Sequence, residues 1–217
     1  MNVLVMYDRQ TGSYWSQLLG RAVEGELSGT QLEPLTATQT TWANWKSLHP
    51  DTKALRKGTI DTYDPYTEYH SSSEAGMTGE ARQDHRLHAK ALGLGFVANG
   101  QPAYFPLIRL VKQRVVNDTV AGEPVLVIFQ PDVSTALAFK RSVAGRVLTF
   151  EVESADTVQF ILTDIETGSR WVAWTGGALD GPLDGEVLER VPATTAFWFG
   201  WKDWYPDTYL YEETPTD

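Results

Sequence analysis

Three aspartates stand at turn positions where their carboxylates could take part in acid–base chemistry. Asp8 and Asp164 each open an Asp-x-x-Thr-Gly-Ser sequence, and Asp118 lies within an Asn-Asp-Thr sequence. Two carboxylates held about 5 to 10 Å apart in one cleft can hydrolyse a glycosidic bond by general acid–base catalysis. No Gly-x-Ser-x-Gly, Walker or Ser-x-x-Lys motif specifies another reaction. A carboxylate-dependent hydrolase is therefore one hypothesis, but no motif supports it and no catalytic residue is assigned.

A second hypothesis gives ligand binding to four residues. Trp15 and Trp171 follow the two Asp-x-x-Thr-Gly-Ser sequences, and their indole rings could stack on a sugar or another ligand. Asn117 and Asp118 could present an amide and a carboxylate to a ligand or cation. Each residue also has a structural interpretation, because tryptophan packs across hairpins, and Asn and Asp form turns. We keep both interpretations and name these four residues as ligand-binding candidates.

The sequence favours neither a metal site nor a cofactor site. His85 and His88 would share one face of a helix, which suits Zn²⁺, but a zinc site needs three or four ligands and no second histidine pair follows. We expect solvated histidines. Residues 93–98 match a dinucleotide fingerprint in their glycines only, because the turn-forming residues 99–102 stand where a helix would have to receive the pyrophosphate. No metal and no cofactor is therefore expected.

The charge balance restricts the possible partners. The 217 residues include 18 Lys and Arg against 28 Asp and Glu, which gives a formal net charge of −10. Such a chain repels phosphate backbones and anionic lipids, so we expect a small ligand, a glycan or a protein as partner, with no nucleic acid and no membrane insertion. The absence of cysteine excludes disulfides and thiolate chemistry. No basic segment followed by an apolar run begins the sequence, so it carries no export signal and leaves the compartment undetermined.

An internal repeat organises the sequence. Residues 8–52 align with residues 164–208 at a constant offset of 156 without a gap, and 20 of the 45 positions are identical. Each copy begins with Asp-x-x-Thr-Gly-Ser, which predicts a hairpin whose aspartate caps the turn and whose glycine has a positive φ. Each copy then predicts a short helix that ends before Pro-Asp-Thr. The second helix is apolar nearly all round, so we expect it to be the more buried of the two.

The residues before the second copy predict a series of short strands. Residues 94–98 and 103–105 flank Asn99-Gly100, a strong hairpin signal, and a helix is expected from Pro106 to Gln113. β-branched runs separated by Gly, Pro or Asp predict further strands. These runs are residues 115–120, 125–129, 135–139, 147–152 and 158–163.

The predicted fold is mainly β with short helices, a β-rich α+β class with an internally duplicated unit. We expect a partial unit at 1–52, a polar connecting segment at 53–91, a complete unit at 92–211 and a tail at 212–217. The connecting segment is long for a loop in a compact domain, so an interaction loop or a linker is expected there. Its tyrosines, Tyr63, Tyr66 and Tyr69, alternate with acidic residues and form either an exposed interaction strip or packing contacts.

These sequence blocks resemble an uncharacterised prokaryotic family known as domain of unknown function 3179. The matching blocks are residues 6–15, 41–52, 115–125 and 166–171. The resemblance implies two tandem units, the first with its own Asn-Asp-Thr block followed by Cys-Pro-x-Cys, which this chain lacks. It also implies that many relatives are exported or lipid-anchored. It supports the fold and leaves the function open.

The leading hypothesis is a ligand-binding or structural module. The alternatives are the carboxylate-dependent hydrolase and an inactive, N-terminally truncated fragment of a longer two-unit protein. The lopsided repeat, with about 70 strand-forming residues before the second hairpin and seven before the first, motivates the fragment hypothesis.

Overall fold

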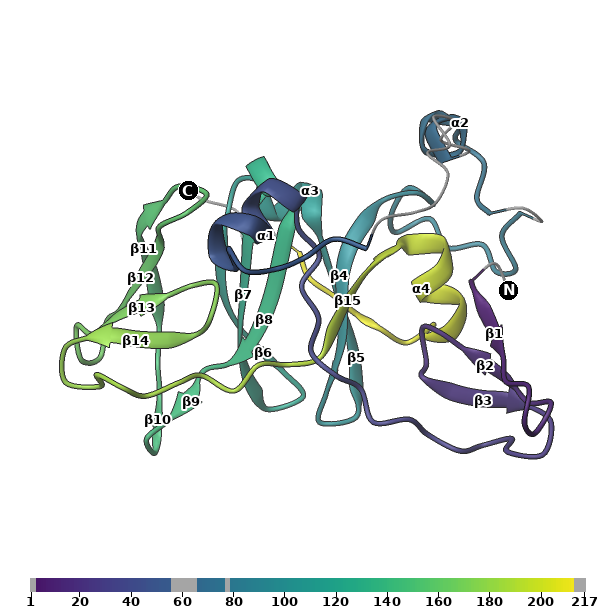
Figure 1. The fold of residues 1–217 in the computed structure, drawn as a ribbon, viewed down its shortest axis with the longest axis horizontal. Coiled ribbons are helices and arrows are strands. Elements are labelled where there is room, and N and C mark those ends of the chain that lie inside the picture. Colours follow the sequence, from purple (N-terminus) through teal and green to yellow (C-terminus); the bar gives the residue numbers. More distant parts are fainter. Residues whose placement is uncertain (1–2, 56–65, 77–78, 213–217) are drawn as a thin grey trace.

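The computed structural model describes residues 3–55, 66–76 and 79–212. Within this part of the chain, sixteen strands form five sheets, joined by four short α-helices and one 3₁₀ turn. The prediction of a mainly β fold with short helices is confirmed. The sheets follow one another along the molecule, with β11–β14 at one end, β1–β3 at the other and two sheets between them (Figure 1).

The two central sheets are built from the residues that precede the second copy of the repeat. One sheet has the order β15-β4-β5-β16 and the other the order β6-β7-β8. Asn99 and Gly100 have φ angles of 46° and 78°, so the predicted hairpin between β4 and β5 is confirmed. The strand bounds are β4 Leu92–Ala98, β5 Gln101–Pro106, β6 Val115–Val120, β7 Glu123–Gln130, β8 Thr135–Lys140, β15 Ala193–Phe197 and β16 Tyr209–Leu210.

A shared hydrophobic core joins these two sheets. Phe96 and Phe105 from the first sheet belong to the same buried cluster as Val127 and Phe129 from the second. The rings of Phe96 and Phe105 stack with their centroids 5.4 Å apart. Burial of such side chains contributes roughly 25 cal/mol for each Å² of apolar surface removed from water, so this cluster holds the centre of the molecule together.

The two copies of the hairpin form the terminal sheets. The first has the order β1-β2-β3 and the second the order β11-β12-β13-β14. Their bounds are β1 Val5–Tyr7, β2 Tyr14–Ser16 and β3 Arg21–Glu24, then β11 Phe150–Ala155, β12 Phe160–Asp164, β13 Arg170–Val172 and β14 Gly177–Asp180. A small ribbon of β9 (Ser142–Val143) and β10 (Arg146–Val147) leads into the second of them.

The two predicted repeat helices are present and differ in burial, as expected. Helix α1 covers Trp42–Leu48 and buries only Asn44, whereas helix α4 covers Trp198–Trp204 and buries all of its residues except Trp204. The Thr41 hydroxyl accepts a hydrogen bond from the Asn44 N–H at 3.2 Å and so caps the start of α1. Both helices end one or two residues before a proline, which cannot continue them.

Each terminal sheet lies against the helix of the other copy. Leu48 of α1 packs on the buried cluster that contains Trp171 of β13. Leu18, which follows β2, packs on the cluster of Tyr104 and the α4 residues Trp198 and Trp201. Figure 1 shows the same exchange, with α4 beside β1–β3 and α1 on the side of β11–β14. The chain therefore crosses the molecule between each hairpin and its helix.

Two predicted elements differ from the structure. The expected helix at residues 106–113 is a single turn, α3 (Leu107–Leu110), with Pro106 as the residue before it. The expected strand at 147–152 is divided between β10 and β11, because Val147 pairs with Ser142 of β9 whereas the residues from Phe150 onward pair with β12.

The predicted connecting segment also holds structure. Helix α2 (Tyr66–Ser71) lies within it, and Tyr63 falls outside the described residues. None of the helices in the described part of the chain has the length and apolar character of a membrane-spanning segment.

Candidate functional site

The first Asp-x-x-Thr-Gly-Ser sequence closes the hairpin between β1 and β2. One oxygen of the Asp8 carboxylate accepts the Thr11 N–H at 2.7 Å, and the other accepts the Thr11 hydroxyl at 2.7 Å and the Trp15 indole N–H at 2.9 Å. Gly12 has a φ of 71°, which a residue with a side chain rarely adopts. The predicted turn cap and glycine conformation are therefore confirmed.

The second copy repeats these contacts at the offset of 156. The Asp164 carboxylate accepts the Thr167 N–H at 2.6 Å, the Thr167 hydroxyl at 2.9 Å and the Trp171 indole N–H at 2.9 Å. In both copies a serine hydroxyl also accepts a distant backbone N–H at 3.0 Å, from Leu27 to Ser13 and from Leu183 to Ser169. All of these contacts lie within the hairpins themselves.

This geometry uses both aspartates in turn formation. Three donors favour the ionised carboxylate, and they lower the pKa of Asp8 to about 2, with the Trp15 indole as the largest cause. A group that stays ionised at neutral pH is a poor general acid. The two central sheets also separate β1–β2 from β12–β13 (Figure 1), so Asp8 and Asp164 do not form the close pair that the hydrolase hypothesis needs.

The two candidate tryptophans differ in exposure. Trp171 exposes 0% of its surface, and its ring meets that of Phe150 edge to face at 5.7 Å. A ligand could stack on this ring only after the hairpin opened. Trp15 exposes 9% of its surface and is therefore also largely buried. The two rings lie in different terminal sheets, so the structure does not bring them together.

Asn117 and Asp118 join neighbouring elements. The Asn117 side chain pairs with the backbone of Phe150, donating to its carbonyl and accepting its N–H, both at 2.8 Å. The Asp118 carboxylate accepts the Thr119 N–H at 2.7 Å and the Tyr209 hydroxyl at 2.8 Å. Burial and then this carboxylate raise the pKa of the Tyr209 hydroxyl. Ligand binding by the four candidates stays a prediction, and each already has a partner within the protein.

The histidines of the connecting segment lie in irregular chain. Residues 84–88 form no helix, His85 and His88 are exposed, and the Lys90 N–H donates to the His88 ring at 3.2 Å. Within the described residues no group of three or more His, Cys, Asp or Glu side chains could hold a metal ion. Tyr66 is exposed, whereas the Tyr69 ring contacts Phe197 edge to face at 6.2 Å.

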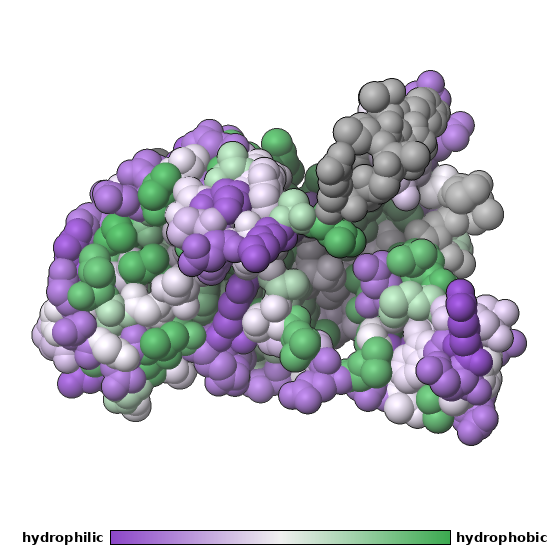
Figure 2. Space-filling model, in the orientation of Figure 1, coloured by the Kyte–Doolittle hydropathy of each residue, from purple (hydrophilic) through white to green (hydrophobic). Residues whose placement is uncertain are grey.

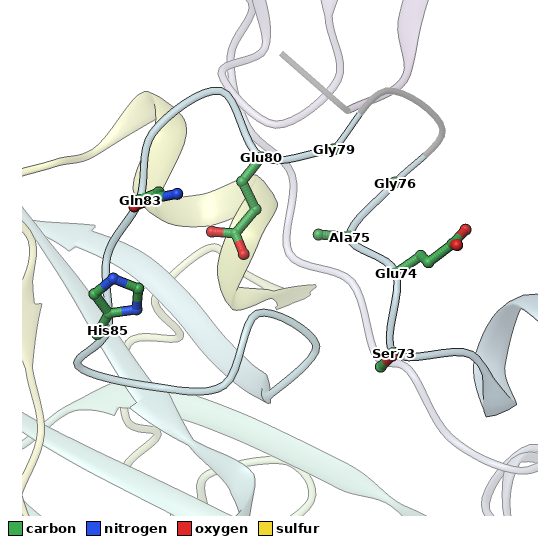
Figure 3. Close-up of a pocket in the computed structure, with 8 residues that line it drawn as sticks. All are labelled: Ser73, Glu74, Ala75, Gly76, Gly79, Glu80, Gln83 and His85. Carbon is green, nitrogen blue, oxygen red and sulfur yellow. The ribbon is translucent and has the colours of Figure 1, made fainter.

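A cavity of about 430 Å³ lies between two stretches of the connecting segment. Figure 3 shows the Glu80 side chain extending into the space between the two stretches, whereas Glu74 points away from it. The walls include Gly76 and Gly79, and the two residues between them are outside the described part of the chain. We therefore assign no ligand to this cavity.

Exposed Glu80 joins the connecting segment to α4 through an ionic cluster with two buried residues of that helix. Its carboxylate lies 3.0 Å from the ammonium group of Lys202, which also contacts Asp203 at 3.2 Å and donates to the Arg82 carbonyl. Lys202 and Asp203 are buried. A buried charge needs such partners, because its desolvation is otherwise expensive. The sequence offers one signal for this cluster, a lysine and an aspartate inside an otherwise apolar helix.

A second cavity, of about 260 Å³, forms an open groove between the first terminal sheet and the edge of the central sheets. We call it the β1–β15 groove. Its wall combines apolar side chains with the backbone of edge strand β15. It is lined by Val3, Leu4, Gln17, Leu18, Tyr69, Thr194, Thr195, Ala196, Phe197, Phe199 and Gly200. Figure 2 shows hydrophobic surface over the position of α4, next to the more hydrophilic β2–β3 hairpin.

Two residues of the groove are smaller than the residues at the equivalent positions of the second terminal sheet. At the offset of 156, Leu4 corresponds to Phe160 and Leu18 to Trp174. Phe160 and Trp174 are buried, and their rings meet edge to face at 5.9 Å. Aromatic rings therefore occupy two positions of the second terminal sheet that hold leucines in the first, whereas Phe197 and Phe199 of the groove correspond to Thr41 and Ala43. The sequence analysis did not single out these two differences in side-chain size, although alignment of the two copies would reveal them.

Comparison with known proteins identifies one family. A family model described as "Protein of unknown function (DUF3179)" matches residues 1–208. No curated protein and no solved structure matches the chain.

Proposed function

Because the chain belongs to the DUF3179 family, which carries no assigned function, we propose from the geometry that the protein is a binding module whose ligand places an aromatic group in the β1–β15 groove. The observation that carries this proposal is the pair of substitutions at the groove, Leu4 for Phe160 and Leu18 for Trp174. Concave, mostly apolar sites are typical of ligand binding, and a volume of about 260 Å³ suits a single small group such as an aromatic ring.

The chemistry of the walls supports an aromatic ligand. Phe197 and Phe199, whose rings stack at 5.8 Å, line the groove together with Leu18. Aromatic rings gain from edge-to-face or offset contacts beyond the area that they bury. Among the described residues that line the groove, Tyr69 alone has an ionisable side chain, so these residues offer no countercharge to a charged ligand group.

The test uses N-acetyl-tryptophan amide as probe and the backbone amide signals of the isotope-labelled protein as readout. We expect saturable shifts at Leu18, Thr195 and Gly200. The variant Leu18→Trp, which installs the residue that the second copy has, should abolish them. Leu4→Phe, at a more exposed position, should weaken them without endangering the fold.

The matched control is Ile108→Trp. It adds the same indole at an exposed site outside the groove, so the probe shifts should stay unchanged. Absence of saturable shifts at the groove residues, or shifts that persist in Leu18→Trp, would overturn the proposal.

A further inference from the structure

The first terminal sheet has one strand fewer than the second. Strand β12 pairs with β13 on one side and with β11 on the other, whereas its counterpart β1 pairs only with β2. Within the described residues, no strand lies against the outer edge of β1. An edge of this kind offers unpaired backbone groups to another extended chain.

The hydrogen bonds of β1 show which groups are available. Leu4 accepts the Gln17 N–H at 3.2 Å, and the Asp8 N–H donates to Ser13 at 3.0 Å, so both residues use their backbone toward β2. Backbone direction alternates along an antiparallel strand, and the N–H and C=O groups of Val5 and Tyr7 therefore point outward. Their counterparts in β12, Ile161 and Thr163, pair with β11.

The side chains of β1 remain exposed as well. Val5, Met6 and Tyr7 expose 44%, 40% and 58% of their surface. In the second sheet, Phe150 of β11 lies opposite Asp164 and covers the edge of Trp171. The equivalent position opposite Asp8, beside Trp15, holds no such ring among the described residues.

We propose that the ligand of the groove is an extended polypeptide segment that adds an antiparallel strand to β1, in the place that β11 takes on β12. The segment carries an apolar residue opposite Asp8, against Trp15, and its C-terminal end reaches Leu4 at the rim of the groove. This inference rests on the proposed function and names its ligand class. Strand addition of this type derives affinity from main-chain hydrogen bonds and specificity from alternate side chains.

Charge predicts one further feature of the segment. On the second sheet, Glu153 of β11 pairs with Arg170 at 2.7 Å. The counterpart of Arg170 is Tyr14, whose ring lies 5.2 Å from that of Tyr7. Two tyrosine faces attract a cation, and the chain carries a net charge of −10. We therefore expect Lys or Arg in the segment where β11 has Glu153.

A second copy of this chain is a poor occupant of the same edge. Strand β1 has three residues and is about 10 Å long, so pairing with another β1 would bury far less than the roughly 1,200 Å² of a stable interface. Two molecules with a charge of −10 would also repel each other.

The experiment adds two synthetic peptides to the full protein. One has the sequence of residues 148–156 with Asp156→Trp, which places an aromatic side chain at the end that reaches the groove, and the other carries Glu153→Lys in addition. Binding is followed by amide shifts and by hydrogen exchange at Val5 and Tyr7. We expect both peptides to protect these amides, and the lysine peptide to bind about two- to fivefold more tightly, as an exposed cation–π contact allows. A peptide of the same composition in scrambled order should not bind.

Two protein variants make the test specific. Val5→Pro removes one outward N–H and should weaken binding by about tenfold, whereas Val5→Thr keeps that N–H and should bind as before. Tyr14→Arg introduces the residue of the second copy and should reverse the preference, so that the glutamate peptide binds more tightly.

The inference fails if neither peptide protects β1, if Val5→Pro binds as well as Val5→Thr, or if protection follows protein concentration alone and a dimer forms. If N-acetyl-tryptophan amide still occupies the groove in that case, only the strand addition is overturned. If the probe also fails, the proposed function falls with it.

Discussion

The two terminal sheets carry the same hairpin contacts in different surroundings. In the second sheet a fourth strand covers β12, aromatic rings fill the space beneath it, and Trp171 is fully buried. In the first sheet the corresponding edge is open, leucines replace the rings, and Trp15 keeps part of its surface exposed. The comparison shows that the Asp-x-x-Thr-Gly-Ser-x-Trp sequence forms the same turn in both sheets. The residues at neighbouring positions determine how much of each sheet is buried.

The largest expected difference between the two sheets is in the free energy of unfolding that is lost when Trp171 or Trp15 is replaced by alanine. Trp171→Ala removes a buried ring and its hydrogen bond to Asp164, so we expect a loss of about 3 to 5 kcal/mol in the free energy of unfolding. Trp15→Ala should cost less, because Trp15 lies in a sheet of three strands rather than four and keeps 9% of its surface exposed. Urea unfolding followed by far-ultraviolet circular dichroism measures both. Equal losses would show that the two sheets contribute alike to the core.

A smaller effect should distinguish the two helices. The Trp201 indole donates to the Thr208 hydroxyl at 2.9 Å, and the Trp45 indole donates to Thr52 at 3.0 Å. Thr208→Val leaves a buried donor unpaired and should cost about 1 to 3 kcal/mol, whereas at the more exposed Thr52 water can replace the hydroxyl and Thr52→Val should cost about 0.5 kcal/mol. The same urea titrations test this difference, and a larger effect at Thr52 would contradict it.

The smallest effect concerns pH. The folded protein holds the pKa of Asp8 at about 2, below the ordinary value of 3.8, so its ionised form contributes stability that is complete above about pH 5 and is lost as the pH falls toward 2. The difference in Tm between the natural protein and Asp8→Asn should therefore be constant near neutral pH and shrink on acidification.

An NMR titration of the Asp8 carboxyl provides the direct measurement. We expect a midpoint near pH 2, and Thr11→Val, which removes the hydroxyl donor but keeps the backbone one, should raise it. A midpoint close to 3.8 in the natural protein would show that the hairpin does not favour the ionised form.

Much of the local structure could be predicted from the sequence because local signals determine it. The Asn99-Gly100 turn, the capped hairpins and the helices ending before Pro50 and Pro206 depend on residues only a few positions apart. The length of α3 was missed, and so was the division at Leu148, where the two parts of the run pair with different neighbours, β9 and β12, which side-chain type alone does not distinguish.

The candidate site was harder to predict for a physical reason. The groove is formed by Leu4 and Leu18 together with Phe199, which belongs to the other copy of the repeat and lies 181 residues after Leu18. The candidate aspartates and tryptophans are chemically plausible site residues, but Asp8, Asp164, Trp15 and Trp171 bond within their own hairpins, and Asp118 bonds to Tyr209. The useful signal lay in positions where the two copies differ in side-chain size.

The exchange of helices between the two terminal sheets has a consequence for how the chain reaches its fold. Leu48 and Trp171 belong to one packed group, as do Leu18 and Trp198, so contacts that support both ends of the molecule close loops of more than 100 residues. High contact order of this kind slows folding. In addition, neither half of the polypeptide contains both a terminal sheet and the helix that packs against it. Two fragments divided within the connecting segment would have to reassemble by complementation in trans before either hairpin sheet had its helix.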